Sequence, residues 1–587
     1  MLRLATFLSL ALLAGSSVRA ADGKEAPKKK PPVIAHLKLS GNMAEQAPST
    51  DPLGSSLVEA FKAKIDRLKK VAADKEVAAV LLEVNGVSAG FGKLNEITVA
   101  IARIRAAGKK VHAFIEGGEM KDWLIGLACD EVAIPESSWL MLTGLRSEIT
   151  FYKGLFDKLG IKADFVMMGD FKSAAEPYLR DSLSEANRKQ MTEMIDDFFE
   201  NDLVGRIVKG RKGMDAAKVK EIIDGGPYSA RAAKKLGLVD RLCYYEDMEG
   251  IIKEALKADD AKLVKDYGKK KEEELTIASL YSKLLFGGGS GKSSSKNPKV
   301  AVIYATGMIV TGKGASSPFM GDAMGSDTMV KAIREAIDDK TVKAIVLRID
   351  SPGGSALASD LMWKELKRAK KPIIASMADV AASGGYYIAM AADRIYAEPG
   401  TVTGSIGVLG GKLTMRGLYD KLGIKTEVIK RGENAGLLSG DLFTDSQKKA
   451  FREMMEDTYA QFIDKALEGR KKAGKDMTRE QLVKLAGGRV WTGRQAKQNG
   501  LIDELGTLED AIAAAAKLGG LPPEPELIQM PKPKNFLDSL LGGGLGVNVD
   551  LKTVTPELAQ KLAGVAPLWE LRREPVWALV PWSISVK

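Results

Sequence analysis

The stretch Asp-Lys-Leu-Gly-Ile-Lys occurs twice in the chain, at residues 157–162 and again at residues 420–425, an offset of 263 positions. Further upstream, DKEVAAVLLEV at 74–84 matches DKTVKAIVLRI at 339–349, at a separation two residues longer. Self-similarity over so long a period is not typical of a solenoid, whose repeats are short. The sequence therefore predicts a tandem duplication of one domain.

Each copy alternates short β-branched runs with amphipathic helical patterns. In the second copy, VAVIYATGMIV (300–310), VKAIVLRI (342–349) and KPIIASM (371–377) predict buried strands. The segments 326–339 and 357–369 between them predict amphipathic helices. Strands that alternate with helices indicate an α/β class, with a mostly parallel sheet covered by helices.

Composition shifts divide the chain further. We expect an N-terminal repeat at 31–255, a helical and Gly/Ser/Lys-rich linker at 256–298 and a C-terminal repeat at 299–520. The run GGGSGKSSSK at 287–296 cannot bury apolar area and is typical of a flexible linker. The remaining residues, 521–587, begin with a Pro-rich stretch and contain three tryptophans, which predict either an interfacial belt or a cap on the folded body.

The first twenty residues, MLRLATFLSLALLAGSSVRA, have the pattern of a signal peptide with cleavage after Ala20. Their apolar stretch is shorter than the roughly 20 residues that span a bilayer, although a retained N-terminal anchor is the alternative. We therefore expect an exported protein, either periplasmic or at the periplasmic face of the inner membrane.

Composition excludes several classes of function. The 587 residues carry Lys+Arg 87 against Asp+Glu 76, a net charge of +11 without the dense basic stripe of a nucleic-acid-binding protein. The surplus favours an anionic membrane surface only weakly. With Cys 2 and His 2 in the whole chain, a disulfide framework and a Cys-rich metal site are excluded, and histidine-based catalysis is disfavoured.

One glycine-rich segment has the pattern of a catalytic turn. Ser383-Gly384-Gly385 follows a predicted strand and opens a predicted helix, which would place free backbone N–H groups beside the serine hydroxyl. A second glycine-rich segment, Ser351-Pro-Gly353-Gly354, follows another strand. A Ser-Gly-Gly turn alone is more often structural than catalytic, so the interpretation depends on finding a base.

The duplication points to that base. At the offset of 263, Ser383 and Ser405 of the second copy have no hydroxyl counterpart in the first, and Lys172 of the first copy has no amine counterpart in the second. The residues at the corresponding positions are Met120, Leu142 and Ala435. Because each copy holds what the other lacks, a Ser–Lys pair assembled across the two domains is the natural hypothesis. Lys172 would then need burial, since an exposed lysine is protonated at neutral pH.

These segments closely resemble the long, double-domain form of the signal peptide peptidase A (protease IV) family. The matching motifs are FKSAAEPY at 171–178, SPGGS at 351–355, AASGGYYIA at 381–389 and TGSIGV at 403–408. The resemblance covers roughly residues 31–515. It implies a fold like that of the Clp protease and crotonase superfamily, no metal or nucleotide cofactor, and a homotetramer that cleaves released signal peptides. The better-known members of this family keep a membrane anchor, whereas the apolar segment of this chain is short and has the pattern of a cleaved signal.

The resemblance also implies a role for each site residue. It assigns Ser383 as the nucleophile, Lys172 as the general base and Ser405 as the residue that orients the lysine. The oxyanion hole is expected from backbone N–H groups at Gly384 and around Gly353 and Gly354.

Three other functions share parts of this pattern. A crotonase-type acyl-CoA enzyme would share the fold, but it would have little use for an export signal. A non-catalytic envelope scaffold is opposed by the retained set of Lys172, Ser383 and Ser405. A broader envelope protease that acts on exported or misfolded proteins stays open, because one sequence does not show the shape of the substrate groove.

Overall fold

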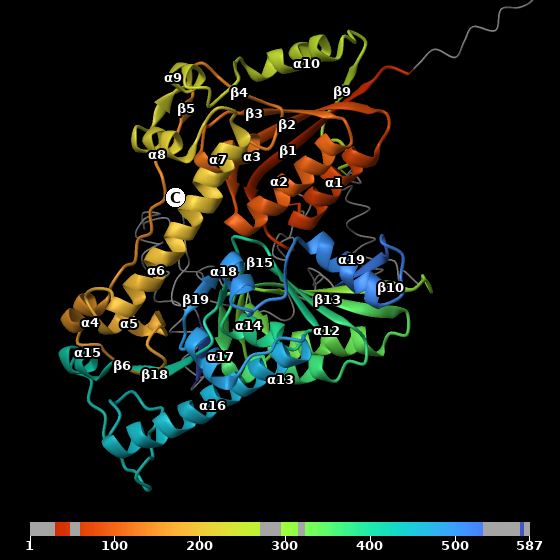
Figure 1. Cartoon of the computed structure of the whole chain (residues 1–587). Coiled ribbons are helices and arrows are strands. Elements are labelled where there is room, and N and C mark those ends of the chain that lie inside the picture. Colours follow the sequence, from red (N-terminus) through yellow and green to blue (C-terminus); the bar gives the residue numbers. More distant parts are fainter. Residues whose placement is uncertain (1–29, 47–58, 270–294, 315–322, 532–575, 580–587) are drawn as a thin grey trace, which may run out of the picture.

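The computed structural model of the chain describes residues 30–46, 59–269, 295–314, 323–531 and 576–579. The expected signal segment 1–20 lies outside these residues, as do most of the expected linker and most of the expected tail. The two copies form two α/β units, an N-terminal unit (30–269) and a C-terminal unit (295–531), which are stacked in Figure 1. Among the described residues, no helix combines the length and the apolar character needed to cross a membrane.

The N-terminal unit is built on a parallel sheet with the strand order β8-β4-β3-β2-β1-β9. Helices return the chain between successive parallel strands, as the alternating pattern predicts. The strands are β1 (Val33–Asn42), β2 (Val77–Ser88), β3 (Lys110–Ile115), β4 (Glu131–Ile134), β8 (Arg241–Leu242) and β9 (Lys262–Val264). A separate pair is formed by β5 (Trp139–Leu140) and β7 (Tyr228–Ser229). The helices are α1 (Phe61–Ala73), α2 (Phe91–Ala106), α3 (Met120–Gly126), α4 (Lys153–Leu159), α5 (Glu176–Leu179), α6 (Glu185–Asp197), α7 (Gly205–Gly210), α8 (Ala216–Asp224), α9 (Ala230–Lys235) and α10 (Met248–Leu256).

The C-terminal unit has a larger sheet with the strand order β19-β17-β15-β13-β10-β21. Outside this order, β16 pairs with β15, and β20 pairs with β16. Its strands are β10 (Lys299–Thr306), β13 (Val342–Ser351), β15 (Ile373–Ala382), β16 (Arg394–Ala397), β17 (Val402–Gly404), β19 (Val490–Thr492), β20 (Glu504–Leu505) and β21 (Glu526–Met530). Its helices are α12 (Ser326–Asp338), α13 (Ala356–Lys367), α14 (Gly384–Ala389), α15 (Arg416–Lys421), α16 (Asp445–Lys472), α17 (Arg479–Leu485), α18 (Gly493–Gln498) and α19 (Leu508–Leu518). Strand β21, which comes from the stretch expected to be a tail, pairs with β10 at the edge of this sheet.

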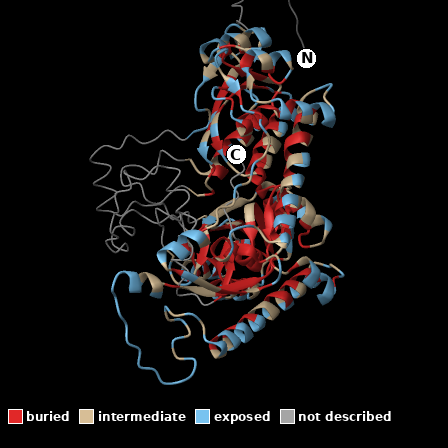
Figure 2. Cartoon of the chain, turned by 90° about the vertical axis from the view of Figure 1, so that its left-hand side faces the viewer, coloured by how far each residue is buried: buried red, intermediate tan, exposed pale blue. Residues whose placement is uncertain are grey.

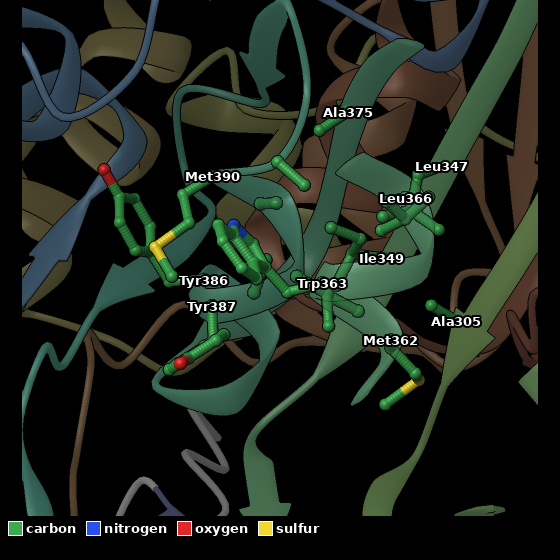
Figure 3. Close-up of a cluster of buried hydrophobic side chains, with 14 of the residues drawn as sticks. Ala305, Leu347, Ile349, Met362, Trp363, Leu366, Ala375, Tyr386, Tyr387 and Met390 are labelled. Atoms are coloured by element: carbon green, nitrogen blue, oxygen red, sulfur yellow. The ribbon is translucent and has the colours of Figure 1, made fainter. Parts of the chain in front are cut away.

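Buried side chains fill the interior of both units, whereas α16 runs along the outside of the C-terminal unit with one face exposed (Figure 2). Figure 3 shows part of the core of the C-terminal unit, where Ile349 of β13 and Trp363 of α13 belong to the same buried cluster as Tyr386 and Tyr387 of α14. Burial of each large apolar side chain contributes about 1.5–3 kcal/mol. This packing fixes α14, and with it Ser383, the residue that immediately precedes the helix.

A third sheet contains strands from both units. Its order is β12-β11-β14-β22-β18-β6, where β6 (Lys162–Met168) belongs to the N-terminal unit. The other strands are β11 (Met308–Val310), β12 (Ala323–Gly325), β14 (Gly353–Ser355), β18 (Val408–Thr414) and β22 (Trp577–Leu579). Residues 152–179, which include α4, β6 and α5, form an arm that reaches from the N-terminal unit to the neighbourhood of α15 and β18 (Figure 1).

The two units repeat the same local structure at the offset seen in the sequence. Strands β3 and β4 begin at Lys110 and Glu131, and their counterparts β15 and β16 begin at Ile373 and Arg394. The copies differ in the segments that follow these strands. Residues 425–431, which correspond to β6, form no strand. Residues 145–151, the counterpart of β18, form no strand either.

Candidate active site

The three side chains singled out in the sequence lie together between the two units. Lys172 Nζ is 2.8 Å from Ser383 Oγ and 3.0 Å from Ser405 Oγ, and it donates to the Ser405 carbonyl at 3.2 Å. All three residues are buried, with exposed fractions of 1% for Lys172 and 0% for both serines. A lysine of the first copy therefore contacts two serines of the second, as the reciprocal losses in the repeat predict.

Strand pairing between the units brings the lysine to the serines. Strand β6 pairs antiparallel with β18, with Met168 opposite Val408 at one end of the ladder. Lys172 follows the end of β6 by four residues, and Ser405 precedes the start of β18 by three. The antiparallel register places these two chain ends side by side. The contact between Lys172 and Ser405 thus depends on the pairing of one copy with the other.

The turn that carries Lys172 packs against the loop 486–489 of the C-terminal unit. The Phe171 N–H donates to the Gly487 carbonyl at 3.0 Å, and the Ser405 N–H donates to the Arg489 carbonyl at 2.7 Å. Gly488 has φ +83°, and a Cβ on it would lie 2.5 Å from the Cα of Lys172. A glycine is therefore required at this position, both for the left-handed backbone and for the close approach of the lysine.

Helix α6 supports the same turn from the other side. Gln190 Nε2 donates to the Phe171 carbonyl at 3.2 Å and to Ser173 Oγ at 3.0 Å. The Gln190 Oε1 accepts from the Val490 N–H at 3.2 Å, so that one buried amide links the lysine turn to β19. Because these are buried polar groups, loss of the amide would leave donors and acceptors of both units unpaired.

Burial lowers the pKa of the Lys172 amine well below its usual range. Desolvation disfavours the charged form of a lysine, and nothing else contributes comparably to the shift. The amine is consequently biased toward its neutral form, whose lone pair can accept a proton from Ser383. This is the electrostatic condition that a lysine base requires.

Ser383 has an unusual backbone conformation at the turn between β15 and α14. Its φ is +56°, a region that non-glycine residues rarely adopt, and its N–H donates to the Gly404 carbonyl at 2.8 Å. The strain is supported by the buried packing around α14 and holds the hydroxyl toward Lys172. Ser405 has a similar backbone, with φ +51°.

The glycines expected to form the oxyanion hole line one edge of this site. A Cβ on Gly353, where φ is +96°, would lie 2.7 Å from the Gly384 nitrogen, so β14 and the start of α14 are in close contact. The Gly353 N–H donates to Ser351 Oγ at 3.2 Å, and the same hydroxyl donates to the Gly307 carbonyl at 2.6 Å. Ser351 is therefore engaged within its own loop, and Gly384 and Gly354 are left as the candidate donors.

Sequence reasoning did not find Gln190, Gly488 or the strand Trp577–Leu579. The glycine pair 487–488 was a usable signal, because adjacent glycines often mark close backbone approach. Gln190 carries no such signal, since its role depends on a contact between units. The sequence predicts a belt or a cap for the three tryptophans of the C-terminal stretch, and the structure places one of them, Trp577, within the third sheet.

Comparison with known proteins identifies the family. Peptidase family S49 matches the chain twice, at residues 103–260 and 365–521, which confirms the tandem duplication of an α/β domain. Serine protease SPPA, chloroplastic, from Arabidopsis thaliana is 34% identical, over 89% of this chain and 76% of its own length. Protease 4 from Salmonella typhi is 31% identical, over 83% of this chain and 78% of its own length. A putative signal peptide peptidase SppA from Enterococcus faecium is 30% identical, over 49% of this chain and 86% of its own length. The chain therefore belongs to peptidase family S49 and is a serine peptidase.

Proposed function

We propose that the chain is an endopeptidase in which Ser383 is the nucleophile, Lys172 is the general base and Ser405 orients the lysine. The observation that carries this proposal is the distance of 2.8 Å between Lys172 Nζ and Ser383 Oγ in a buried site. The lowered pKa of Lys172 supports it, because only the neutral amine can take the serine proton.

The reaction proceeds through an acyl-enzyme. Lys172 accepts the hydroxyl proton of Ser383 while Oγ attacks the carbonyl carbon of the scissile bond, and the resulting oxyanion is stabilised by backbone N–H groups of Gly384 and Gly354. Lys172 then donates the proton to the leaving amine. A water molecule hydrolyses the ester by the same steps, with Lys172 again as the base. Ser405 keeps the amine aimed at Ser383 throughout, through its contact of 3.0 Å with Nζ.

Released signal peptides are the proposed substrates, and the protein is proposed to act in the periplasm or at the periplasmic face of the inner membrane. The motifs at 171–178 and 381–389 and the name of the Enterococcus faecium relative support this substrate class. The signal-like segment at 1–20 supports the export of the chain.

Digestion of a synthetic signal peptide by the wild type, Ser383→Ala and Lys172→Ala tests the proposal, with the fragments read by mass spectrometry. We expect fragments only from the wild type, with cuts within the apolar region of the peptide. Peptide cleavage by folded Lys172→Ala at the wild-type rate would contradict the assignment of the base. An intact peptide in all three reactions would contradict the substrate class.

The protein is also proposed to assemble as a homo-oligomer, for which the resemblance implies a tetramer. Strand β6 of the first copy pairs with β18 of the second copy within the chain. The counterpart of β6 in the second copy is 425–431, and the counterpart of β18 in the first copy is 145–151. Neither of these two segments forms a strand. In the first of these segments Val428 is 66% exposed and Ile429 is 91% exposed. A neighbouring chain that repeats the contact between β6 and β18 would cover them.

Glycines at the same contact support this assembly. The backbones of Gly160 and Gly417 touch, since a Cβ on Gly160 would lie 2.6 Å from the Gly417 carbonyl carbon. Their counterparts in the repeat, Gly423 and Gly154, have open space around them. Ile429→Asp should therefore lower the mass of the assembly in light scattering, with Leu518→Asp, an exposed apolar residue on α19, as the control. An unchanged mass for Ile429→Asp would contradict this interface.

A further inference from the structure

The N-terminal unit brings a second buried lysine to the neighbourhood of the candidate active site. Lys93, in the first turn of α2, is 6% exposed, and its Nζ donates to Asp350 Oδ2 of the C-terminal unit at 2.6 Å. Asp350 immediately precedes the loop 351–354, which carries candidate oxyanion glycines. A lysine of one unit therefore binds the segment that leads into the oxyanion loop of the other.

Asp350 joins two segments of the proposed catalytic machinery. The pairing of β13 with β15 is irregular at Asp350, where β15 has two more residues than β13 between one pair and the next. The extra residues of such a bulge lack ladder partners. Here the Val380 N–H donates instead to Asp350 Oδ1 at 3.1 Å. Asp350 thus ties the start of the oxyanion loop to a backbone group three residues before Ser383.

The start of α2 differs from that of its counterpart in the repeat, α13. In α13, the Ala358 N–H donates to the hydroxyl of the capping residue Ser355 at 3.2 Å. In α2 the capping position is Gly90, which has no side chain. The N–H groups of Gly90 and Lys93 donate instead to the Asp379 carboxylate, at 2.9 and 2.8 Å. The bulge of the second copy therefore supplies the cap that the first copy lacks.

Glycines allow this close approach between the units. A Cβ on Gly90 would lie 2.5 Å from Asp379 Cγ, and a Cβ on Gly92 would lie 2.7 Å from the Ala378 carbonyl oxygen. Any side chain at these positions would push the helix away from the bulge. The first turn of α2 is consequently fitted to the bulge that lies just before Ser383.

Lys93 is the cation at the centre of this contact. Its Nζ is also 3.8 Å from Asp379 and 3.7 Å from Glu45, and Lys121 lies near Asp379 as well. Within the described part of the chain, Asp350 has no other cation within 4.0 Å. Burial raises the pKa of Asp379, while the charge of Lys93 opposes this rise and that of Asp350 adds to it. Loss of Lys93 would therefore leave two carboxylates that repel each other across the bulge.

We propose that Lys93 is a positioning residue, which acts through Asp350 to hold the oxyanion loop and the turn of Ser383 in a fixed relation. This inference rests on the proposed function. The N–H groups of Gly384 and Gly354 belong to these two segments, so their relation decides whether both can donate to one oxyanion. Donors that meet the oxyanion act mainly on the transition state, and a change in their positions lowers kcat with little effect on KM.

Steady-state cleavage of the synthetic signal peptide tests the inference with four variants. These are Lys93→Met, Asp350→Ala, the double variant and Lys62→Met. Lys62 is the matched control, because it is a buried lysine of α1 that pairs with Asp66 and lies 4.0 Å from Glu509 of the other unit, and neither partner belongs to β13 or β15.

We expect Lys93→Met to lower kcat about 10–100-fold and to leave KM within a factor of about two, whereas Lys62→Met should keep the wild-type values. The double variant should have the kcat of Asp350→Ala, because Lys93 acts through that carboxylate.

Two inhibitors with the sequence of a short peptide substrate give a second readout. Ser383 Oγ adds to the carbonyl carbon of a peptide aldehyde, whose oxygen then takes the place of the oxyanion, whereas the matching peptide alcohol binds without a new bond. Lys93→Met should weaken inhibition by the aldehyde about as much as it lowers kcat, and should leave inhibition by the alcohol within a factor of about two. A loss of folded protein would change neither inhibition constant.

The outcomes separate the inference from the proposed function. A wild type that cleaves the peptide, together with equal kcat values for Lys93→Met and Lys62→Met, overturns the role of Lys93 alone. A wild type that leaves the peptide intact overturns both. Folded Asp350→Ala with the wild-type kcat overturns the inference even if Lys93→Met does not fold, since this variant removes the group through which Lys93 acts. Equal weakening of the aldehyde and the alcohol also overturns it.

Discussion

The backbone of Gly488 in the C-terminal unit lies directly against the backbone of Lys172 in the N-terminal unit. A Cβ on Gly488 would approach the Cα, Cβ and nitrogen of Lys172 to 2.5 Å. The lysine turn can therefore reach the two serines only because this neighbour has no side chain. Gly487, the preceding residue, has a similar φ of +66°, but its Cβ would meet nothing closer than 3.8 Å.

Because only a Cβ on Gly488 would meet Lys172, the variants Gly488→Ala and Gly487→Ala form a matched pair. Both Gly488→Ala and Gly487→Ala place alanine in a left-handed conformation, which costs about 1–2 kcal/mol of folding free energy. Only Gly488→Ala also displaces Lys172, and a shift of about 1 Å at a catalytic group can lower the rate on the order of 100-fold. Peptide cleavage assays and urea unfolding of both variants check this. Equal activity in the two variants would contradict the role of the close contact.

The pH dependence of cleavage should follow the protonation of Lys172. Burial lowers the pKa of this amine, and the neutral form is the active one, so kcat/KM should rise with pH through the lowered pKa and then level off below the usual lysine pKa of about 10.4. A pH–rate profile with a short peptide checks this. A profile that keeps rising to pH values near that of an exposed lysine would be inconsistent with a buried base.

The free energy of unfolding should also depend on pH, because the pKa of Lys172 is lower in the folded chain than in the unfolded chain. Between the lowered pKa and about 10.4 the unfolded chain binds a proton at Lys172 that the folded chain does not, so the free energy of unfolding rises with pH by about 1.4 kcal/mol per pH unit in that window. Lys172→Met removes this contribution and should stabilise the fold most at the low end of the window. Urea unfolding at several pH values measures the difference, with Lys189→Met, an exposed lysine on α6, as the control.

Ser405→Ala should lower kcat about 10–100-fold and leave KM within a factor of about two, because the hydroxyl touches the base and not the substrate in the proposed mechanism. Thr403→Val is the matched control. Thr403 is equally buried, and its hydroxyl donates to the Ala381 carbonyl at 2.7 Å, away from Lys172. Steady-state kinetics of the two variants would show equal kcat values if the hydroxyl of Ser405 had no positioning role.

The two units are also joined by a buried ion cluster. Arg348 of β13 is 0% exposed and donates through Nη2 to Glu45 at 2.8 Å and to Glu96 of α2. Arg348→Met removes the cation shared by two buried carboxylates, of which Glu45 keeps only Lys93 at 3.7 Å, and we expect a loss of about 3–5 kcal/mol. Arg334→Met breaks an ion pair of 3.0 Å whose arginine is 57% exposed, and it should destabilise the fold far less, because water and salt screen an exposed pair. Thermal and urea unfolding of both variants compare the two losses. Similar losses would show that Arg348 does not hold the units together.

Part of the architecture was predictable because it depends on local patterns. Periods of apolar residues predicted the strands and helices of each unit, since residues that face a core recur at the spacing of the element. The repeat of DKLGIK predicted the duplication, which the double match to one family confirms. The same repeat pointed to Lys172, Ser383 and Ser405, because comparison of the two copies shows which polar residues one copy has and the other lacks.

Other features depend on contacts between segments that are remote in the chain. The pairing of β6 with β18, the amide of Gln190 and the approach of Lys172 to Gly488 all join one unit to the other. The spacing of apolar residues within one segment does not predict which residues of two remote segments will face each other. That depends on how the surfaces of the two units fit together. The same holds for β22, whose residues carry no sign of their partner β14.

The sequence by itself determined which residues could perform the chemistry, because a hydroxyl, an amine and flexible glycines are properties of residue types and their spacing. Only the tertiary structure decided that these groups meet, that the lysine is desolvated and that the C-terminal strand lies between β14 and β18. The physical reason is that burial, and therefore the pKa of Lys172, arises from side chains and backbone contributed by both units at once.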